Sequence, residues 1–507
     1  MDTHALSRIL PGLCLLWLGL LLSSSAAAQV PAWRRVVNVV SLQGAGPKGL
    51  ATATDGAGNV YVTGGFEGTV RFGTTQLTSA GGSDVFVAKW SSATGRWIWA
   101  YGGGGTGFDT GHSIAVSGNS IYLTGQIGTG TPTQEAPEAM QGLFSRIVLA
   151  APVNVNFQDV LVAKLTDAGP TARVNWAYAA GGPGLDVGRS IAIDGPNVYL
   201  TGSVEGIATS PPFRFGPNRM QGLSRAKQWI GTNEMDTFIA KYVDAGDSAK
   251  VGWVMLRGSE GPDEGQGIAV SGGNVYVTGG EGRRNPEFRK NNPHGPVMAA
   301  AAGPEKSQDM FLVKYLDAGA TATEAWARYG GGTYADAGQA LAVSGSSVYV
   351  TGYVQNDWIA PAGSMRVRFD GVTLRGLSPA PNREVFVAKY TDAGSTATLA
   401  WAKNIGVGRG NSIAVSGNAL LVTGAKDGQL FVAKYLDDGP APQEAWTITG
   451  SGSGLQGGSS ISLAAGRAYI TGTAGAKAQL GGILLTNQQG TMSFLAEAVN
   501  IESNKRP

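Results

Sequence analysis

Four aspartates occupy equivalent places in a repeated sequence pattern. Each lies five residues before the first apolar residue of a short strand-like segment, at Asp109, Asp186, Asp263 and Asp336. If the repeats surround one axis, the four carboxylates lie near one mouth of a central channel. There they form a partial ring for a cation or a hydroxyl-rich ligand, since hard cations bind several oxygens.

The same aspartates also have a structural interpretation. Each is placed to cap its own glycine-rich turn by accepting hydrogen bonds from backbone amides. The sequence holds no DxDxDG calcium loop, so we predict no metal site. Both interpretations of the carboxylates, ligand binding and turn capping, are kept at this point.

A histidine supplies a further candidate at the same mouth. His112 immediately precedes a strand-like segment, and His294 is the only other histidine after the amino-terminal segment. A lone histidine is usually structural or solvated, and the sequence has no GxSxG, HExxH or P-loop motif. We therefore predict no catalytic residue and no cofactor. A polysaccharide-active hydrolase or lyase built on loop carboxylates is the alternative, because such acids follow no sequence spacing rule.

Basic side chains gather in the long segments between the repeats, and they include Arg283 and Arg284. Such a cluster can meet an acidic polysaccharide or an acidic patch of a partner protein, or it can simply be solvated. Glu281 and Glu287 dilute its field. The chain carries 38 basic and 36 acidic residues, a formal net charge of +2, so nucleic acid is not an expected partner.

Four short motifs in fixed order must position these side chains. They are "SIAVSG" (113–118), "VYVTG" (60–64), "DVFVAKW" (84–90) and a tryptophan segment such as that around Trp99. Each is rich in β-branched or aromatic residues and bounded by turn formers, which predicts a strand. "SGN" and "DAG" between the motifs are typical of tight turns. We expect the lysine of "VAK" to extend from between sheets or to pair locally, and the tryptophans to pack between sheets.

The number of repeats predicts a closed ring. Near-copies of "VYVTG" end at Gly64, Gly125, Gly202, Gly279, Gly352, Gly424 and Gly472. A single sheet of this sequence has two apolar faces, which only neighbouring sheets packed face to face can bury. We predict an all-β fold, a seven-bladed β-propeller of four-stranded antiparallel blades. The last blade lacks its own tryptophan strand, so the segment around Trp33 is expected to complete it and to remove an open edge.

The combined motifs resemble a known family of repeats. "DVFVAKW" and "WAYGGGGTGFDTGHSIAVSGNSIYLTG" (99–125) have copies over nearly all of the chain after the first residues. They resemble the SBBP repeats, the seven-bladed β-propeller repeats of secreted bacterial proteins. The resemblance implies the propeller fold and export, but it implies no single activity.

The first residues predict export. Arg8 precedes an apolar run from Ile9 to Leu22, and small residues follow, which is typical of a secretory signal cleaved after Ala28. We expect a signal peptide over 1–28, the propeller over 29–498 and a short tail over 499–507, in an extracellular or periplasmic protein. The only cysteine, Cys14, lies in the signal, so no disulfide is predicted. No later stretch is apolar enough to predict a membrane span.

The long segments after the "VYVTG" copies indicate where function lies. They cover 126–158, 203–235, 280–308 and 353–383, and we expect them on one face of the propeller. Binding residues commonly gather on loops held by a rigid frame. We expect a monomeric, non-enzymatic propeller that binds an unidentified protein or polysaccharide through this face. A purely structural module of the cell envelope is a third hypothesis beside the enzyme.

Overall fold

The chain forms antiparallel β-sheets, as predicted. The structure, a computed structural model, describes residues 31–128, 141–145, 158–182, 184–206, 213–216, 218–220, 234–258, 261–282, 308–332, 334–355, 367–374, 376–377, 382–452, 457–475, 477–486 and 492–502. Besides strands and turns these residues contain one short 3-10 helix, η1 (Gly142–Phe144). In this described part of the chain, no helix has the length and apolar character needed to cross a membrane.

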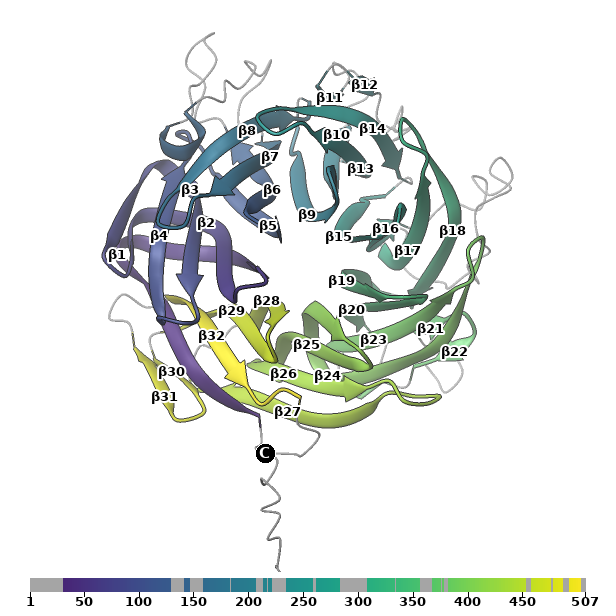
Figure 1. The fold of residues 1–507 in the computed structure, drawn as a ribbon. Helices are drawn as coiled ribbons and strands as arrows, with labels where there is room; N and C mark the ends of the chain where they lie inside the picture. The colour runs from purple at the N-terminus through teal and green to yellow at the C-terminus, as the bar shows by residue number, and fades with distance from the viewer. Residues whose placement is uncertain are drawn as a thin grey trace, which may run out of the picture.

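A four-stranded antiparallel unit recurs, with its first strand near the centre of the molecule and its fourth at the rim (Figure 1). Each unit is named after its inner strand. The β5 unit holds β5 (Thr110–Ser117), β6 (Ser120–Gly128), β7 (Gln158–Asp167) and β8 (Ala172–Ala180). The β9 unit holds β9 (Val187–Asp194), β10 (Asn197–Gly206), β13 (Glu234–Asp244) and β14 (Ala249–Arg257). The β15 unit holds β15 (Glu264–Ser271), β16 (Asn274–Gly282), β17 (Gln308–Asp317) and β18 (Ala322–Gly331).

Two long strands each belong to two units. The β19 unit holds β19 (Ala337–Ser344), β20 (Ser347–Gln355), β23 (Arg383–Asp392) and the first part of β24 (Ala397–Ser416). The β24 unit holds the rest of β24, β25 (Ala419–Lys426), β26 (Gln429–Leu436) and β27 (Gln443–Ser451). The long strand β1 (Ala32–Thr54) connects the two ends of the chain in the same way.

The segment around Trp33 pairs with the last strand. The β28 unit holds β28 (Gly457–Ala464), β29 (Arg467–Ala474), β32 (Met492–Val499) and the first part of β1, in which Ala32 lies opposite Val499. The second part of β1 forms the β1 unit with β2 (Asn59–Phe72), β3 (Thr75–Ser91) and β4 (Arg96–Gly103). The first and last parts of the chain therefore share one sheet.

Short hairpins lie outside the four-stranded units. One consists of β11 (Phe213–Phe215) and β12 (Asn218–Met220). A second, β21 (Arg368–Phe369) with β22 (Val372–Thr373), adds to the outer strand β18. A third, β30 (Lys477–Leu480) with β31 (Ile483–Thr486), adds to β27. Insertions between second and third strands thus extend the rim.

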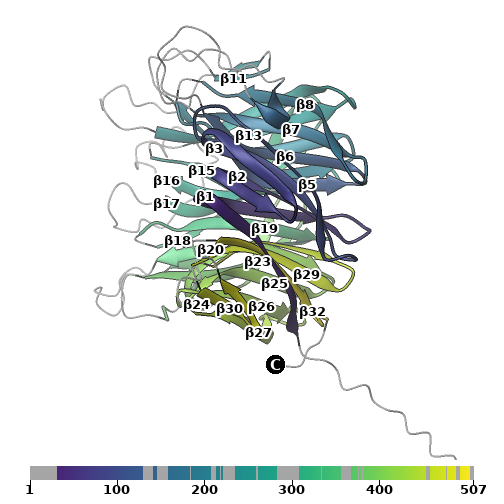
Figure 2. The ribbon, with the colours of Figure 1, turned by 90° about the vertical axis from the view of Figure 1, so that its left-hand side faces the viewer.

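The inner strands contact one another in sequence around the centre. β5 contacts β9, β9 contacts β15, and the series continues through β19, β24 and β28 to β1, which also contacts β5. Seen from the side, the strands of successive units run between the same two end faces (Figure 2). Side chains add links between units, because the Ile191 amide donates to Ser113 Oγ and the Thr52 amide to Ser460 Oγ, both at 3.2 Å.

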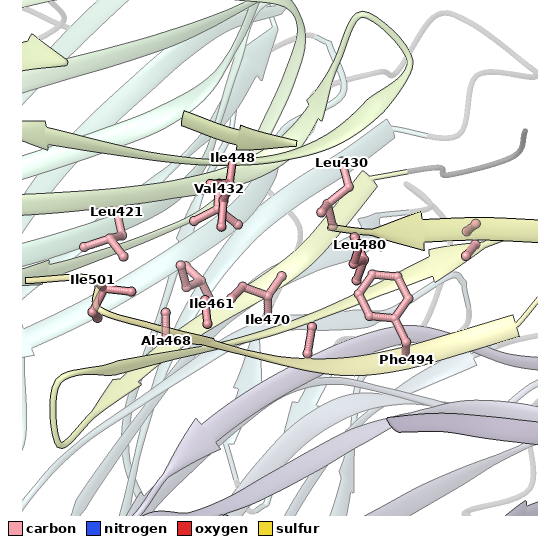
Figure 3. Close-up of a cluster of buried hydrophobic side chains, with 14 of the residues drawn as sticks. Leu421, Leu430, Val432, Ile448, Ile461, Ala468, Ile470, Leu480, Phe494 and Ile501 are labelled. Carbon is pink, nitrogen blue, oxygen red and sulfur yellow. The ribbon is translucent and has the colours of Figure 1, made fainter. Parts of the chain in front are cut away.

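The hydrophobic core lies between the facing sheets of neighbouring units. Between the β24 and β28 units, Leu421 and Val432 pack with Ile461, Ile470 and Phe494, all of them buried (Figure 3). Burying one such side chain contributes about 1.5–3 kcal/mol relative to leaving it exposed. Because a unit is apolar on both faces, stability depends on its two neighbours.

A repeated polar network joins the units as well. A lysine of the third strand pairs with the aspartate that begins the turn after the third strand of the next unit. The pairs are Lys89–Asp167, Lys164–Asp244, Lys241–Asp317, Lys314–Asp392 and Lys389–Asp437, with Nζ–Oδ2 distances of 2.5–2.6 Å. The partners are 48 to 80 residues apart, so the lysines do not make the local pairs that were one expectation.

Candidate functional site

The four predicted aspartates are buried turn caps. All have 0% relative exposure: Asp109, Asp186, Asp263 and Asp336. Asp109 accepts hydrogen bonds from the amides of Gly105 and Gly128, both at 2.6 Å, and so ties the turn before β5 to the end of β6. Asp186 and Asp336 make equivalent bonds. These contacts are those of the structural interpretation, and a role in ligand binding stays a prediction.

A second carboxylate from the preceding unit lies beside each of these aspartates. A Cβ built on Gly181 would lie 2.2 Å from Asp186 Oδ2 and 2.9 Å from Asp159 Oδ1, so one glycine separates two carboxylates. Burial raises the pKa of Asp159 to about 7, and burial together with the nearby Asp159 raises the pKa of Asp186. The protonated form is therefore favoured in this pair. Among the described residues, no group of three or more His, Cys, Asp or Glu is placed to hold a metal ion.

The other predicted residues fall in different places. Arg283 and Arg284 lie outside the described residues. His112 lies in β5, where its Nδ1 is 3.1 Å from Gly188 O. Burial and the nearby Arg189 guanidinium lower the pKa of His112 to about 3. The imidazole is therefore neutral near pH 7 and acts as a hydrogen-bonding group.

His112 occupies a β-bulge that recurs in the inner strands. The register of β5 with β6 shifts between Gly111 and Ser113, which leaves His112 without a partner residue in the ladder. The same shift skips one polar residue in each of the strands that follow: Arg189, Gln266, Gln339, Asn411 and Ser459. A bulge re-aims its extra side chain and is common next to functional sites. The bulge is the same in these six strands, whereas the polar side chain at its extra residue varies: it is His, Arg, Asn or Ser in four of them and Gln in β15 and β19.

The glycine before each bulge is explained by close packing. A Cβ on Gly188 would lie 2.1 Å from Oγ1 of Thr124, which belongs to the preceding unit. The "TG" threonine of one unit therefore touches the inner strand of the next. This contact fixes the bulge relative to the neighbouring sheet.

Three of the bulge residues, Arg189, Gln266 and Gln339, line a pocket with a volume of about 400 Å³. The charged side chains beside them are Glu264, Arg383 and Arg409. The pocket lies where β9, β15 and β19 begin and where β16 and β20 end. This is the end of the units from which the long segments 283–307 and 356–382 leave, and we call it the long-loop end.

Positive charge exceeds negative charge in this pocket. Three guanidinium groups surround it with one carboxylate, Glu264, and within the described residues no ion pair joins them. Glu264 Oε2 instead accepts a hydrogen bond from Gln266 Nε2 at 2.5 Å. Burial lowers the pKa of Arg189, and burial together with repulsion from Arg383 and Arg189 lowers the pKa of Arg409. The Nε atoms of Arg189 and Arg409 are buried and make no hydrogen bond to the described protein.

Tyr353 holds two of the guanidinium groups. The Arg383 guanidinium lies 4.2 Å from the centre of its ring, and that of Arg409 lies 5.3 Å away. Arg409 also donates a hydrogen bond to Gln339 Oε1. No serine, cysteine or histidine lines the pocket in the described part of the chain. The arrangement can bind an anion, and the described residues that line the pocket include no nucleophile paired with a base.

Sequence reasoning missed the pocket, although a signal for it was present. The residue between the repeated glycine and the "SIAV"-type motif is His, Arg, Gln, Gln, Asn or Ser, while its neighbours recur. A position that varies inside a repeated frame is a candidate for ligand contact. Only His112 was singled out from this position.

Comparisons with known proteins give distant structural similarities. No protein-family model matches the sequence, and a search of curated proteins finds no match. The chain is similar to β-propeller-like structures. One is an oligogalacturonate lyase in complex with manganese (TM-score 0.37, 8% identity, 92% of this chain and 98% of that one). Others are a putative 6-phosphogluconolactonase from Bacteroides uniformis (0.30, 11%, 75% and 94%) and TolB from Acinetobacter baumannii (0.26, 9%, 73% and 77%). The resemblance to SBBP repeats stays a prediction.

Proposed function

We propose that this chain is an exported, closed seven-bladed β-propeller that binds a small ligand in the pocket at its long-loop end, without catalysis. Ring closure is supported by the pairing of β1 with both β32 and β2, and by the contact of β1 with β28 and β5. The seven copies of the "VYVTG" motif agree with that count. Export rests on the signal-like segment 1–28, which lies outside the described residues.

The observation that carries the binding function is the recurrent bulge. It presents a polar side chain on six inner strands, from β5 to β28, and three of these side chains share one pocket. A volume of about 400 Å³ falls within the range of about 300–1,000 Å³ that is common for small-molecule sites. No observation favours the carboxylate-based enzyme, because the four aspartates are fully buried and bonded to backbone amides.

The test is a thermal-shift and calorimetry panel of small sugars, sugar acids and organic acids on the purified mature chain. Gln266→Trp fills the pocket from one wall and should abolish any binding that the panel finds. Ser271→Trp places the same side chain at the opposite, exposed end of β15 and should leave binding unchanged. Binding that survives Gln266→Trp, or no binding to any member, contradicts the proposal. Amino-terminal sequencing of the exported protein, with Gln29 expected first, tests the signal.

A further inference from the structure

The charge of the pocket at the long-loop end restricts the class of ligand. Arg189 and Arg409 are both partly buried, and neither has a carboxylate within ion-pair distance among the described residues. Guanidinium groups that are desolvated and close to one another raise the free energy of the empty site. An oxyanion placed between them relieves this repulsion.

The remaining wall indicates hydroxyl groups on the same ligand. Gln266 and Gln339 face the pocket with Gln308, whose Nε2 donates to Pro262 O at 2.7 Å and is thereby held in place. Amide groups and the Glu264 carboxylate together offer donors and acceptors of the kind that sugar hydroxyls require. Apolar ligands are poorly matched to this wall.

The aromatic side chain in the pocket does not change this conclusion. Tyr353 has a relative exposure of 7%, and the guanidinium groups of Arg383 and Arg409 lie over its ring. No open aromatic face is therefore left for stacking a flat ring. Recognition must come from charge and hydrogen bonds.

From these contacts we infer that the ligand is a hydroxylated organic anion of monosaccharide size, with its carboxylate or phosphate between Arg189 and Arg409. The inference rests on the proposed function, that this pocket is a ligand site. It goes beyond that function by assigning the anion to two named arginines and the hydroxyl groups to the glutamine wall.

Calorimetry on the whole mature chain tests the inference with matched probes. The probes are glucuronate, gluconate, glucose 6-phosphate, neutral glucose and inorganic phosphate, each at low and high salt. We expect a hydroxylated acid to bind, with glucuronate and glucose 6-phosphate separating carboxylate from phosphate, and glucose to bind at least 10-fold more weakly. Each of Arg189→Gln and Arg409→Gln should weaken binding of the acid by about 10- to 100-fold, because each removes charge-assisted hydrogen bonds. Arg173→Gln, an exposed arginine at the opposite end, is the control and should have no effect.

The melting temperature of the free protein provides a second readout. If the arginines repel each other in the empty site, Arg409→Gln and Arg189→Gln raise the melting temperature or leave it unchanged. A clear fall in both would show that the arginines are structural and would overturn the inference. Equal binding of glucose and glucuronate that Gln266→Trp abolishes would overturn the anionic ligand while keeping the pocket as the site. Binding of inorganic phosphate alone, without any hydroxylated acid, would overturn the sugar-like ligand.

Discussion

Lys241 Nζ lies 2.6 Å from Asp317 Oδ2, across the boundary between two neighbouring units. Tyr199 donates to the same oxygen at 2.6 Å, and Trp253 Nε1 donates to Oδ1 at 2.9 Å. The side chains of the pair are 4% and 6% exposed. Burial alone would raise the pKa of Asp317, but these hydrogen bonds hold it below its ordinary value. Ionised and fully bonded, the carboxylate joins the units.

Breaking this pair should destabilise the protein strongly. Asp317→Asn leaves the Lys241 ammonium group buried without its counter-charge, and such a loss typically costs about 3–5 kcal/mol. We expect a corresponding fall in the free energy of unfolding in urea. Asp247→Asn is the matched control, because Asp247 pairs with Arg173 at 74% and 63% exposure, where solvent screens the charges, and its loss should have little effect on stability. Equal effects of the two substitutions would contradict the assigned role.

The lysine–aspartate pairs between units also show which contacts can be predicted from a sequence repeat. Both "VAK" and "DAG" are visible as recurrent motifs. The lysine was expected to extend from between sheets or to pair locally, and the aspartate was interpreted only as part of its own turn. The aspartate does cap its turn, since the Gly319 amide donates to Asp317 Oδ1 at 2.9 Å. Its second role depends on how one sheet faces the next. Spacing along the chain carries no information about that arrangement.

The proposed closure of the ring predicts that truncation of the amino-terminal strand destabilises the protein. Removing residues 29–39 takes away the part of β1 that pairs with β32. It also exposes the hydrophobic cluster in which Val39 packs, which includes Leu495. We expect a lower melting temperature and concentration-dependent association, because β32 then has an open edge. Size-exclusion chromatography and calorimetry measure both effects. Removal of residues 503–507 alone should leave the oligomeric state unchanged. An unchanged melting temperature in the first truncation would contradict closure.

The glycine that ends each "VTG" motif predicts a severe substitution. A Cβ on Gly279 would lie 1.9 Å from the carbonyl oxygen of Glu264, a backbone atom of the inner strand beside the pocket. Gly279→Ala should therefore cost about 3 kcal/mol through overpacking, measured as the free energy of unfolding. Gly56→Ala, where a Cβ meets no atom within 4 Å, should stay within about 0.5 kcal/mol. A mild effect at Gly279 would show that the inner strand moves easily.

The sequence predicted the sheets of this fold but not its candidate ligand pocket. Strand patterns and the Trp33 segment predicted the sheets and the pairing of chain ends, because periodicity and strand count are local or additive properties. The arginine pocket was not predicted, because Arg189 and Arg409 come from different units and neither belongs to a repeated motif. The side chains of this pocket differ between repeats, whereas the sequence-based predictions rested on the residues that recur.

The buried acid pairs predict a pH-dependent contribution to stability. The folded-state pKa of Asp159, about 7, lies above its ordinary value of 3.8, so the folded protein binds this proton more tightly than the unfolded chain. Its contribution is complete below about pH 4 and is lost as the pH rises through 7. Asp159→Asn removes the ionisation and should raise the melting temperature at pH 8 relative to the wild type, with a smaller rise at pH 5. Glu67→Gln, at an exposed position, is the control.

The test must compare the melting temperatures of the wild type and Asp159→Asn at each pH, because the ionisation of other groups also changes stability as the pH changes. His112 has its pKa lowered from 6.5 to about 3, so the folded state resists its protonation and its contribution is lost as the pH falls below 6.5. Asp317 and its equivalents have lowered pKa values, and their contribution is lost only below about 3.8. The stability of the wild type therefore combines contributions that rise with pH and contributions that fall with pH. The difference between the wild type and Asp159→Asn isolates the contribution of one carboxyl group. A difference that stays constant from pH 5 to 8 would mean that Asp159 is ionised in the folded protein, and that the pair with Asp186 does not retain a proton.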